Sequence, residues 1–366
     1  MSGRLLTAAG VSVAVVLSTP YIGQIRGAVQ TAFPDQYRAI VAGIIASALV
    51  IAVGLAVARI RERRAFRYGA IVAAVAIAAL YALATQTGQP DRDLVERFHF
   101  VEYGFLTFLF YRAWRPRADA AALVLPVCAG MIVGVADEWF QWFVPTRVGE
   151  MSDVLINSVA VACGLLFSVG VDPPSKTAFA CGASCRQAMA VGLSAVVVAG
   201  AIFVDTLHLG YDIRTPDAGA FRSTFPEQAL RAAAADRVEQ WRRQPPVTAP
   251  GIAREDHYLS EGRWHVQRRN EAWSAGDPWP AWNENLILER FYAPVLDLGS
   301  RWPPEQRADA AAQVAGRSDT YVSDAQPYAI VTLPRLQFWL MIAGIVLVIG
   351  LASRTRPGAP AGAARI

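Results

Sequence analysis

DEWFQWFVPTRVGEMSDVLIN (residues 137–157) joins two apolar segments of the chain that are each long enough to cross a membrane as a helix. Crossing about 30 Å of hydrocarbon takes roughly 17–25 predominantly apolar residues in an α-helix. The quoted stretch nevertheless carries several ionisable and amide side chains. It is also short, so it predicts two neighbouring antiparallel spans with a polar site where they meet.

The composition is typical of a membrane protein. Of 366 residues, 54% are hydrophobic and 17% are charged, and the mean hydropathy is +0.30. Soluble domains average about 25% charged residues. We predict an all-α, polytopic membrane helix bundle with about eight transmembrane helices, of which the fourth is short and rich in aromatic residues. The predicted spans are 5–22, 39–58, 69–86, 99–114, 120–140, 154–171, 188–205 and 336–353.

The distribution of basic residues predicts the orientation of these spans. Loops rich in Lys and Arg are retained in the cytoplasm, and RIRERRAFR (59–67) is the most basic short loop. With this loop inside, alternation places both termini in the cytoplasm of a multi-pass protein of the cell (inner) membrane. The basic net charge of +4 is then a topology signal, and we expect no nucleic-acid partner. The first apolar run has no small-residue cleavage motif, so we expect a retained span.

Between the seventh and eighth spans lies a polar segment, 205–335, which is long enough to form a small domain. The expected organisation is a membrane bundle over 1–204, an extracytoplasmic domain over 205–335, and the last span with a cytoplasmic tail over 336–366. The outer domain is expected to be mostly helical, with no competing strand pattern. Expected helices are 225–243, capped by Thr224, then 255–273 and 281–296.

The remaining candidate ligands give weaker signals. His257, Glu261 and His265 share one face of a predicted helix, and we interpret this face as packed or solvated in preference to metal-binding. Cys181 and Cys185 offer two thiols without an accompanying His, and no disulfide framework is expected. We therefore predict no metal site and no cofactor.

The chemistry-bearing residues gather where three predicted spans reach the outer face of the membrane. Span four begins with His99, Glu102 and Tyr103 on one helical face, and span five ends with acids. Ionisable groups inside a membrane cost roughly 2.5–3.5 kcal/mol each at its centre, which favours a functional role. Capping, above all by Ser152 and Asp153 at the start of span six, is the structural alternative. The other candidates are Asp137, Glu138, Gln141, Arg147, Asp153 and Asn157.

These residues also carry a resemblance. HFVEYGFLTFLF (99–110) and DEWFQWFVPTRVGEMSDVLINSVAVACG (137–164) resemble the VanZ-like membrane family, over about residues 40–171. The family pattern implies roles for His99, Glu102, Glu138, Gln141, Arg147, Asp153 and Asn157, with Asp137 as an additional acid. The family's namesake is associated with low-level resistance to the glycopeptide teicoplanin, so the resemblance implies a role at the cell envelope.

Three functions remain open from the sequence. The first is binding of an anionic lipid or a lipid-linked cell-wall precursor or envelope glycan, with Arg147 pairing with phosphate and Asp137, Gln141, Asp153 and Asn157 contributing polar contacts. The second is acid–base catalysis at the outer leaflet, with His99, Glu102 and Glu138 as candidate catalytic residues. The third is a non-catalytic scaffold. The sequence decides neither whether the protein is an enzyme nor its oligomeric state.

Overall fold

The computed structural model of the chain describes residues 3–88, 90–144, 149–174, 181–246, 257–326 and 328–354, apart from the side chain of Arg92. The chain divides into two compact units. The membrane unit comprises Met1–Phe140, Gly149–Ala201 and Trp339–Ile366, and the second unit comprises Gln141–Val148 and Ile202–Phe338. Each unit has its own packing and its own polar network.

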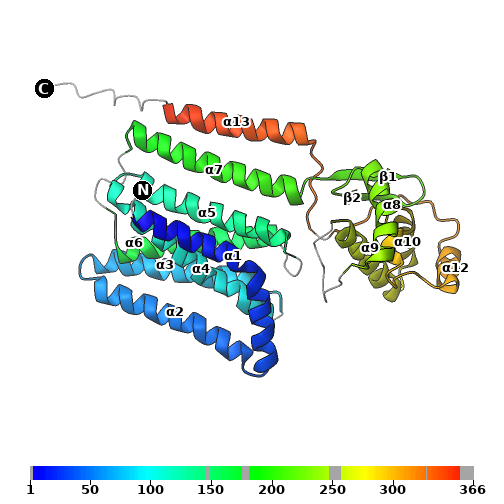
Figure 1. Cartoon of the computed structure of the whole chain (residues 1–366), viewed down its shortest axis with the longest axis horizontal. Coiled ribbons are helices and arrows are strands. Elements are labelled where there is room, and N and C mark those ends of the chain that lie inside the picture. Colours follow the sequence, from blue (N-terminus) through cyan, green and yellow to red (C-terminus); the bar gives the residue numbers. More distant parts are fainter. Residues whose placement is uncertain are drawn as a thin grey trace. The chain divides into compact units, whose positions relative to one another are not determined.

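Within the described residues, seven helices are long and apolar enough to cross a membrane. They correspond to seven of the eight predicted spans, which confirms a polytopic helical membrane protein, while the count of eight stays a prediction (Figure 1). They are α1 (Gly3–Ala32), α2 (Tyr37–Arg59), α3 (Arg64–Ala84), α5 (Ala121–Trp142), α6 (Met151–Val171), α7 (Ala183–Leu207) and α13 (Arg335–Arg354).

The helix α4 (Pro90–Trp114) contains the fourth predicted span and begins nine residues before it. It is the least apolar of the long helices in the membrane unit. Its first turns carry Asp91, Asp93, Glu96 and Arg97, which lowers its hydropathy. It packs against α1, α2, α3 and α6, so neighbouring helices cover much of its surface. By contrast, α2 leaves most of its large apolar side chains exposed, as expected of a helix that faces lipid.

Glycines set the distance between α4, α5 and α6. A Cβ on Gly164 of α6 would lie 2.7 Å from the Cα of Gly104 in α4, so these two backbones touch. A Cβ on Gly130 of α5 would lie 2.8 Å from a methyl group of Val161 in α6. Small residues allow membrane helices to approach this closely and to gain packing energy that burial in hydrocarbon cannot supply.

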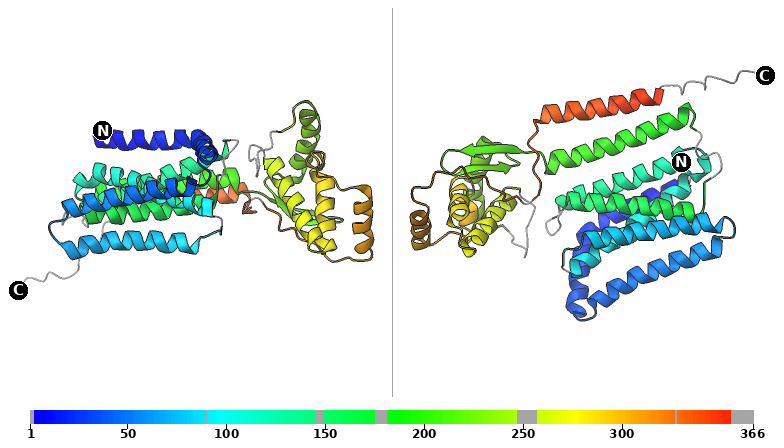
Figure 2. Two further views of the ribbon diagram at one scale, coloured as in Figure 1. Left: turned by 90° about the horizontal axis from the view of Figure 1, so that it is seen from below. Right: turned by 180° about the vertical axis from the view of Figure 1, so that it is seen from behind.

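Helix α1 extends beyond the predicted span, which was expected to end at residue 22. It continues to Ala32 and changes direction along its length, as Figures 1 and 2 show. Pro20 lies inside the helix and supplies the physical reason, because its ring removes one backbone hydrogen bond and clashes with the preceding turn.

A buried arginine contacts the last residues of α6, and a disulfide lies at the start of α7. Arg67 of α3 is buried, and its Nε donates a hydrogen bond to the carbonyl of Gly170 at the end of α6 (2.8 Å), a favourable place for a cation. Cys181 and Cys185 form a disulfide beside the start of α7, which the sequence analysis did not anticipate. One turn of helix brings residues four apart together, and that spacing was the available signal.

The second unit contains five helices and one β-hairpin among its described residues. The hairpin pairs β1 (Tyr211–Thr215) with β2 (Gly219–Ser223), so the expectation of no strands there was wrong. Each strand has five residues, too few for a clear alternating pattern, and Gly219 supplies the positive φ of the turn. The helices are α8 (Glu227–Arg243), α9 (His257–Ser274), α10 (Pro278–Phe291), α11 (Ala293–Leu296) and α12 (Pro304–Gln313).

The helix predictions for this unit were largely correct in position. Helix α8 ends at Arg243, just before the proline pair that was expected to stop it. Thr224 does not cap it, because its hydroxyl donates to Glu261 and Pro226 occupies the N-cap position. Phe291 and Tyr292 are fully buried in the core of the unit, while α12 had no predicted counterpart.

The contact between Gly104 and Gly164 generates a stability prediction. Gly164→Ala should destabilise the protein by about 1–3 kcal/mol, because the new Cβ would meet backbone atoms that cannot move away cheaply. The matched control is Gly54→Ala in α2, where a Cβ would meet nothing within 4 Å. Thermal unfolding of the purified protein in detergent measures both, and equal midpoints for the two variants would contradict the packing assignment.

Candidate functional site

Most of the predicted site residues lie on three helices of the membrane unit that run alongside one another. Residue pairs in contact give the directions: His99 of α4 lies beside Asn157 of α6, and Gly104 beside Gly164, so α4 and α6 run the same way. In α5, Gly130 lies against Val161 and Gly134 against Asn157, so α5 runs the opposite way. The end of α5 therefore meets the first turns of α4 and α6.

Asp137 is held by two hydroxyl groups from two other helices. The hydroxyl of Thr19 in α1 donates to Oδ1 at 2.7 Å, and that of Tyr103 in α4 donates to Oδ2 at 3.0 Å. Asp137 is 5% exposed, and both donors are at least as buried. This arrangement connects α1, α4 and α5 through one carboxylate. Thr19 was not predicted as a member of the cluster; the signal in the sequence was a Thr-Pro pair in an apolar span.

A second chain of hydrogen bonds runs from Glu138 through Asn157 to His99. The amide Nδ2 of Asn157 donates to Oε1 of Glu138 at 3.4 Å, and its Oδ1 lies 2.8 Å from Nδ1 of His99. The carboxylate oxygen accepts, so the amide nitrogen must face Glu138 and the amide oxygen must face His99. Nδ1 of His99 therefore carries a proton, and in the neutral ring Nε2 is the acceptor.

Burial decreases along this chain. Glu138 is fully buried and Asn157 is 1% exposed, whereas His99 is half-buried. Glu102, one turn after His99 on α4, is also half-buried. The network thus begins at a carboxylate inside the bundle and ends at side chains that reach its surface.

Two small features place Asn157 between its partners. A Cβ on Gly134 would lie 3.0 Å from the Cβ of Asn157, so the glycine lets α6 approach α5 at this level. The ring of His99 stacks on that of Tyr103, with their planes 2° apart. Tyr103 thereby supports both the His99 ring and the Asp137 carboxylate.

The remaining predicted residues are placed less directly. Gln141 is buried one helical turn after Asp137, and Arg147 lies outside the described residues. Asp153 is in the first turn of α6, where a negative charge is favoured, but the N-cap residue is Glu150. Ser152 donates to the Glu150 carboxylate, and because α6 begins at Met151, neither Ser152 nor Asp153 occupies the N-cap position of the structural alternative. Within the described part of the chain, no three His, Cys, Asp or Glu residues are placed to hold a metal ion.

The second unit contains a separate polar network built on α9. Glu261 is 1% exposed and accepts four hydrogen bonds, from the hydroxyls of Ser223 and Tyr292 and from the backbone N–H and hydroxyl of Thr224. Burial raises the pKa of Glu261 above its usual value, and the four hydrogen bonds oppose that shift.

The other members of this helix face have different partners. Nδ1 of His265 lies 2.6 Å from Glu284, and both side chains are fully buried, whereas Nδ1 of His257 lies 2.7 Å from the hydroxyl of Tyr328. The three residues share a face, as predicted, but do not converge on one site. The network of Glu261 and His265 ties α9 to the hairpin and to α10.

The Asp137 contacts predict a structural cost for its removal. Asp137→Ala should lower the free energy of unfolding by about 2 kcal/mol, because two buried hydroxyl donors lose their acceptor. Asp91→Ala serves as the control, since Asp91 forms an exposed pair with Arg38 and such pairs contribute about 0–1 kcal/mol. Thermal unfolding in detergent compares the two, and an Asp137→Ala protein as stable as the control would show that the carboxylate does not hold these helices.

The Glu261 network predicts an effect on the second unit. Glu261→Ala should destabilise this unit by about 3 kcal/mol, because it leaves several buried donors without an acceptor. Glu271→Ala, on the exposed side of the same helix, should change little. Hydrogen exchange of amides in β1, β2 and α9 measures this in the full chain. Unchanged protection in Glu261→Ala would contradict the structural role.

Comparison with known proteins bears on the membrane unit. Residues 92–171 match the family model described as VanZ/LLP1, and this range spans α4 from its third residue through α5 and α6. No curated protein and no solved structure matches the chain. The match covers the three helices that carry His99, Asn157, Glu138 and Asp137. The chain is therefore a membrane protein with a VanZ-like core, formed by α4, α5 and α6.

Proposed function

We propose that the VanZ-like core binds the headgroup of an anionic lipid, or of a lipid-linked cell-wall precursor, at the outer face of the membrane. The observation that carries this proposal is the gradient of burial along the polar network, from fully buried Glu138 to half-buried His99, with half-buried Glu102 one turn further along α4. This network leads from the interior to groups that a headgroup could reach.

The chemistry of the network fits a headgroup with both charge and hydroxyl groups. Carboxylates and the His99 ring can pair with sugar or glycerol hydroxyls, while phosphate requires a cation. Arg97 on α4 is half-buried and lies two residues before His99, and Arg147 follows the family pattern in the sequence between α5 and α6. We assign phosphate recognition to Arg147, and the hydroxyl contacts to His99 and Glu102. The family resemblance adds the expectation that loss of this protein lowers tolerance of teicoplanin.

A second candidate function is acid–base catalysis on the same lipid-linked substrate. It is favoured by the fixed tautomer of His99, which presents Nε2 as the ring's acceptor while Asn157 holds Nδ1. An oriented imidazole of this kind is the usual arrangement of a general base. Glu138 acts here as a positioning residue, because it reaches the imidazole through Asn157.

The lipid-binding proposal predicts a specific loss in Arg147→Ala. Nanodiscs of phosphatidylcholine that contain either phosphatidylglycerol or a polyprenyl phosphate should raise the thermal midpoint of the wild-type protein. In Arg147→Ala the rise should become smaller, since a lost charge-assisted hydrogen bond weakens binding at this site by about tenfold or more. Arg38→Ala is the control, because its guanidinium is exposed and pairs with Asp91. The two lipids distinguish a membrane phospholipid from an isoprenoid-linked ligand, and an undiminished rise in Arg147→Ala would contradict the proposal.

Glu138→Gln separates the proposed functions from a scaffold role. If the network serves binding or chemistry, the variant should be as stable as wild type or more stable, because functional clusters are commonly kept at a cost in stability. If the network is a structural lock, the thermal midpoint should fall as it does in Asp137→Ala. If Glu138→Gln keeps the wild-type rise in thermal midpoint with lipid but no longer turns over the polyprenyl-linked substrate, the catalytic function is selected.

A further inference from the structure

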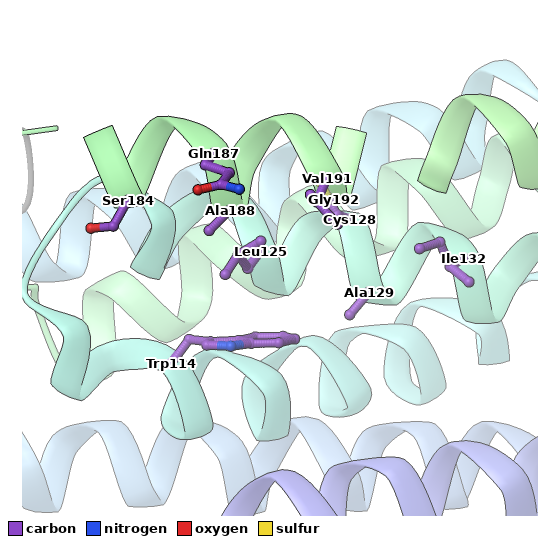
Figure 3. A pocket seen from close by; sticks show the side chains of 10 residues that line it. All are labelled: Trp114, Leu125, Cys128, Ala129, Ile132, Ser184, Gln187, Ala188, Val191 and Gly192. Carbon is purple, nitrogen blue, oxygen red and sulfur yellow. The ribbon is translucent and has the colours of Figure 1, made fainter. Parts of the chain in front are cut away.

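A groove of about 470 Å³ lies in the membrane unit, away from the polar network (Figure 3). One wall is the first half of α5 and the other is the first half of α7, and the indole of Trp114 from the end of α4 extends along it. Trp114 is fixed by stacking on Phe110, with ring centroids 5.6 Å apart. The volume is within the roughly 300–1,000 Å³ of small-molecule sites.

The lining changes from apolar to polar along the groove. Leu125, Ala129 and Ile132 of α5 and Ala188 and Val191 of α7 line most of its length. Ser184 and Gln187 are exposed and lie at the end of the groove where α7 begins. Such a lining matches a molecule with a long apolar part and a polar end.

The surroundings of the groove determine what its apolar part holds. Both walls are helices with the length and composition of membrane spans, and Val191 on the α7 wall is 65% exposed. The groove therefore opens into hydrocarbon, where the available apolar molecules are lipid chains. An acyl chain in the groove would make dispersion contacts with its walls that an empty space would lack.

The charge at the polar end determines the type of headgroup. Arg112, Arg115 and Arg117 surround Trp114 in sequence, and Arg186 lies between Ser184 and Gln187. Asp172 pairs with Arg115 and Asp119 with Arg117, and Arg186 donates to the backbone carbonyls of Cys181 and Ser353, so these four arginines exceed the two acids by two charges. Basic segments beside membrane spans attract anionic lipids.

We propose that this groove is a specific binding site for one anionic phospholipid, with an acyl chain between α5 and α7 and the headgroup at Ser184 and Gln187. The site is independent of the proposed function at His99 and Glu138. Helix α7 comes close to α5 at Gly192, where a Cβ would meet Leu125 and Cys128. A bound acyl chain would fill the space between the two helices beside this contact.

The test uses the full chain in nanodiscs with a photoactivatable phosphatidylglycerol that carries a diazirine in its acyl chain. Cross-links should concentrate on the peptides of α5 and α7 that line the groove, and unlabelled phosphatidylglycerol should compete better than phosphatidylcholine. Ala129→Phe or Ala188→Phe should each lower the cross-link yield by about tenfold, since each fills space equivalent to a few methylene groups. Leu193→Phe, on α7 but outside the lining, should leave it unchanged.

Three results would overturn the proposal. Even labelling of all exposed helices would show ordinary surrounding lipid, and equal competition by phosphatidylcholine would remove the headgroup selectivity. Cross-links between two copies of the chain through the groove would identify a protein occupant. Only a filling variant that retains the wild-type thermal midpoint is compared, so the second variant keeps the test valid if the first misfolds.

Discussion

The contact between Gly104 and Gly164 is the interaction on which the membrane unit depends. Helix α4 carries more polar residues than its neighbours, and polar groups in hydrocarbon require partners within the protein. The glycine contact brings α6 against α4 without side chains between them. That approach sets the register that places Asn157 beside His99 and leaves Asp137 within reach of Tyr103. The polar network is therefore a consequence of close packing as much as of the polar residues themselves.

Asp137 and Glu138 are adjacent in sequence but have different surroundings. Asp137 receives hydroxyl groups from α1 and α4, so its contacts join helices, and its place outside the family pattern agrees with a structural role. Glu138 contacts an amide that in turn orients an imidazole. In the second arrangement, buried Glu138 fixes the orientation of half-buried His99 through Asn157. This difference is why we assign function to the chain through Asn157 and stability to Asp137.

Much of this organisation could be predicted from the sequence, because long apolar runs indicate membrane spans. The pairing of α5 with α6 followed from their short connection, and the gathering of His99, Glu138 and Asn157 followed from the helix ends at which they lie. Thr19 was missed, because the Thr-Pro pair in the first apolar span does not indicate which helix the threonine contacts. The hairpin of β1 and β2 was missed because five residues per strand are too few to show alternation.

Each unit orients a histidine through a contact at Nδ1, but the two histidines differ in their access to solvent. In the second unit, Glu284 holds Nδ1 of His265 as Asn157 holds Nδ1 of His99, so both imidazoles have an oriented ring. His265 is fully buried with its ring 5.3 Å from that of Tyr292, and no substrate could reach it without unfolding of the core. His99 is half-buried at the end of its network. Orientation of a histidine is thus common to a structural and a candidate functional network, and exposure is the property that distinguishes them.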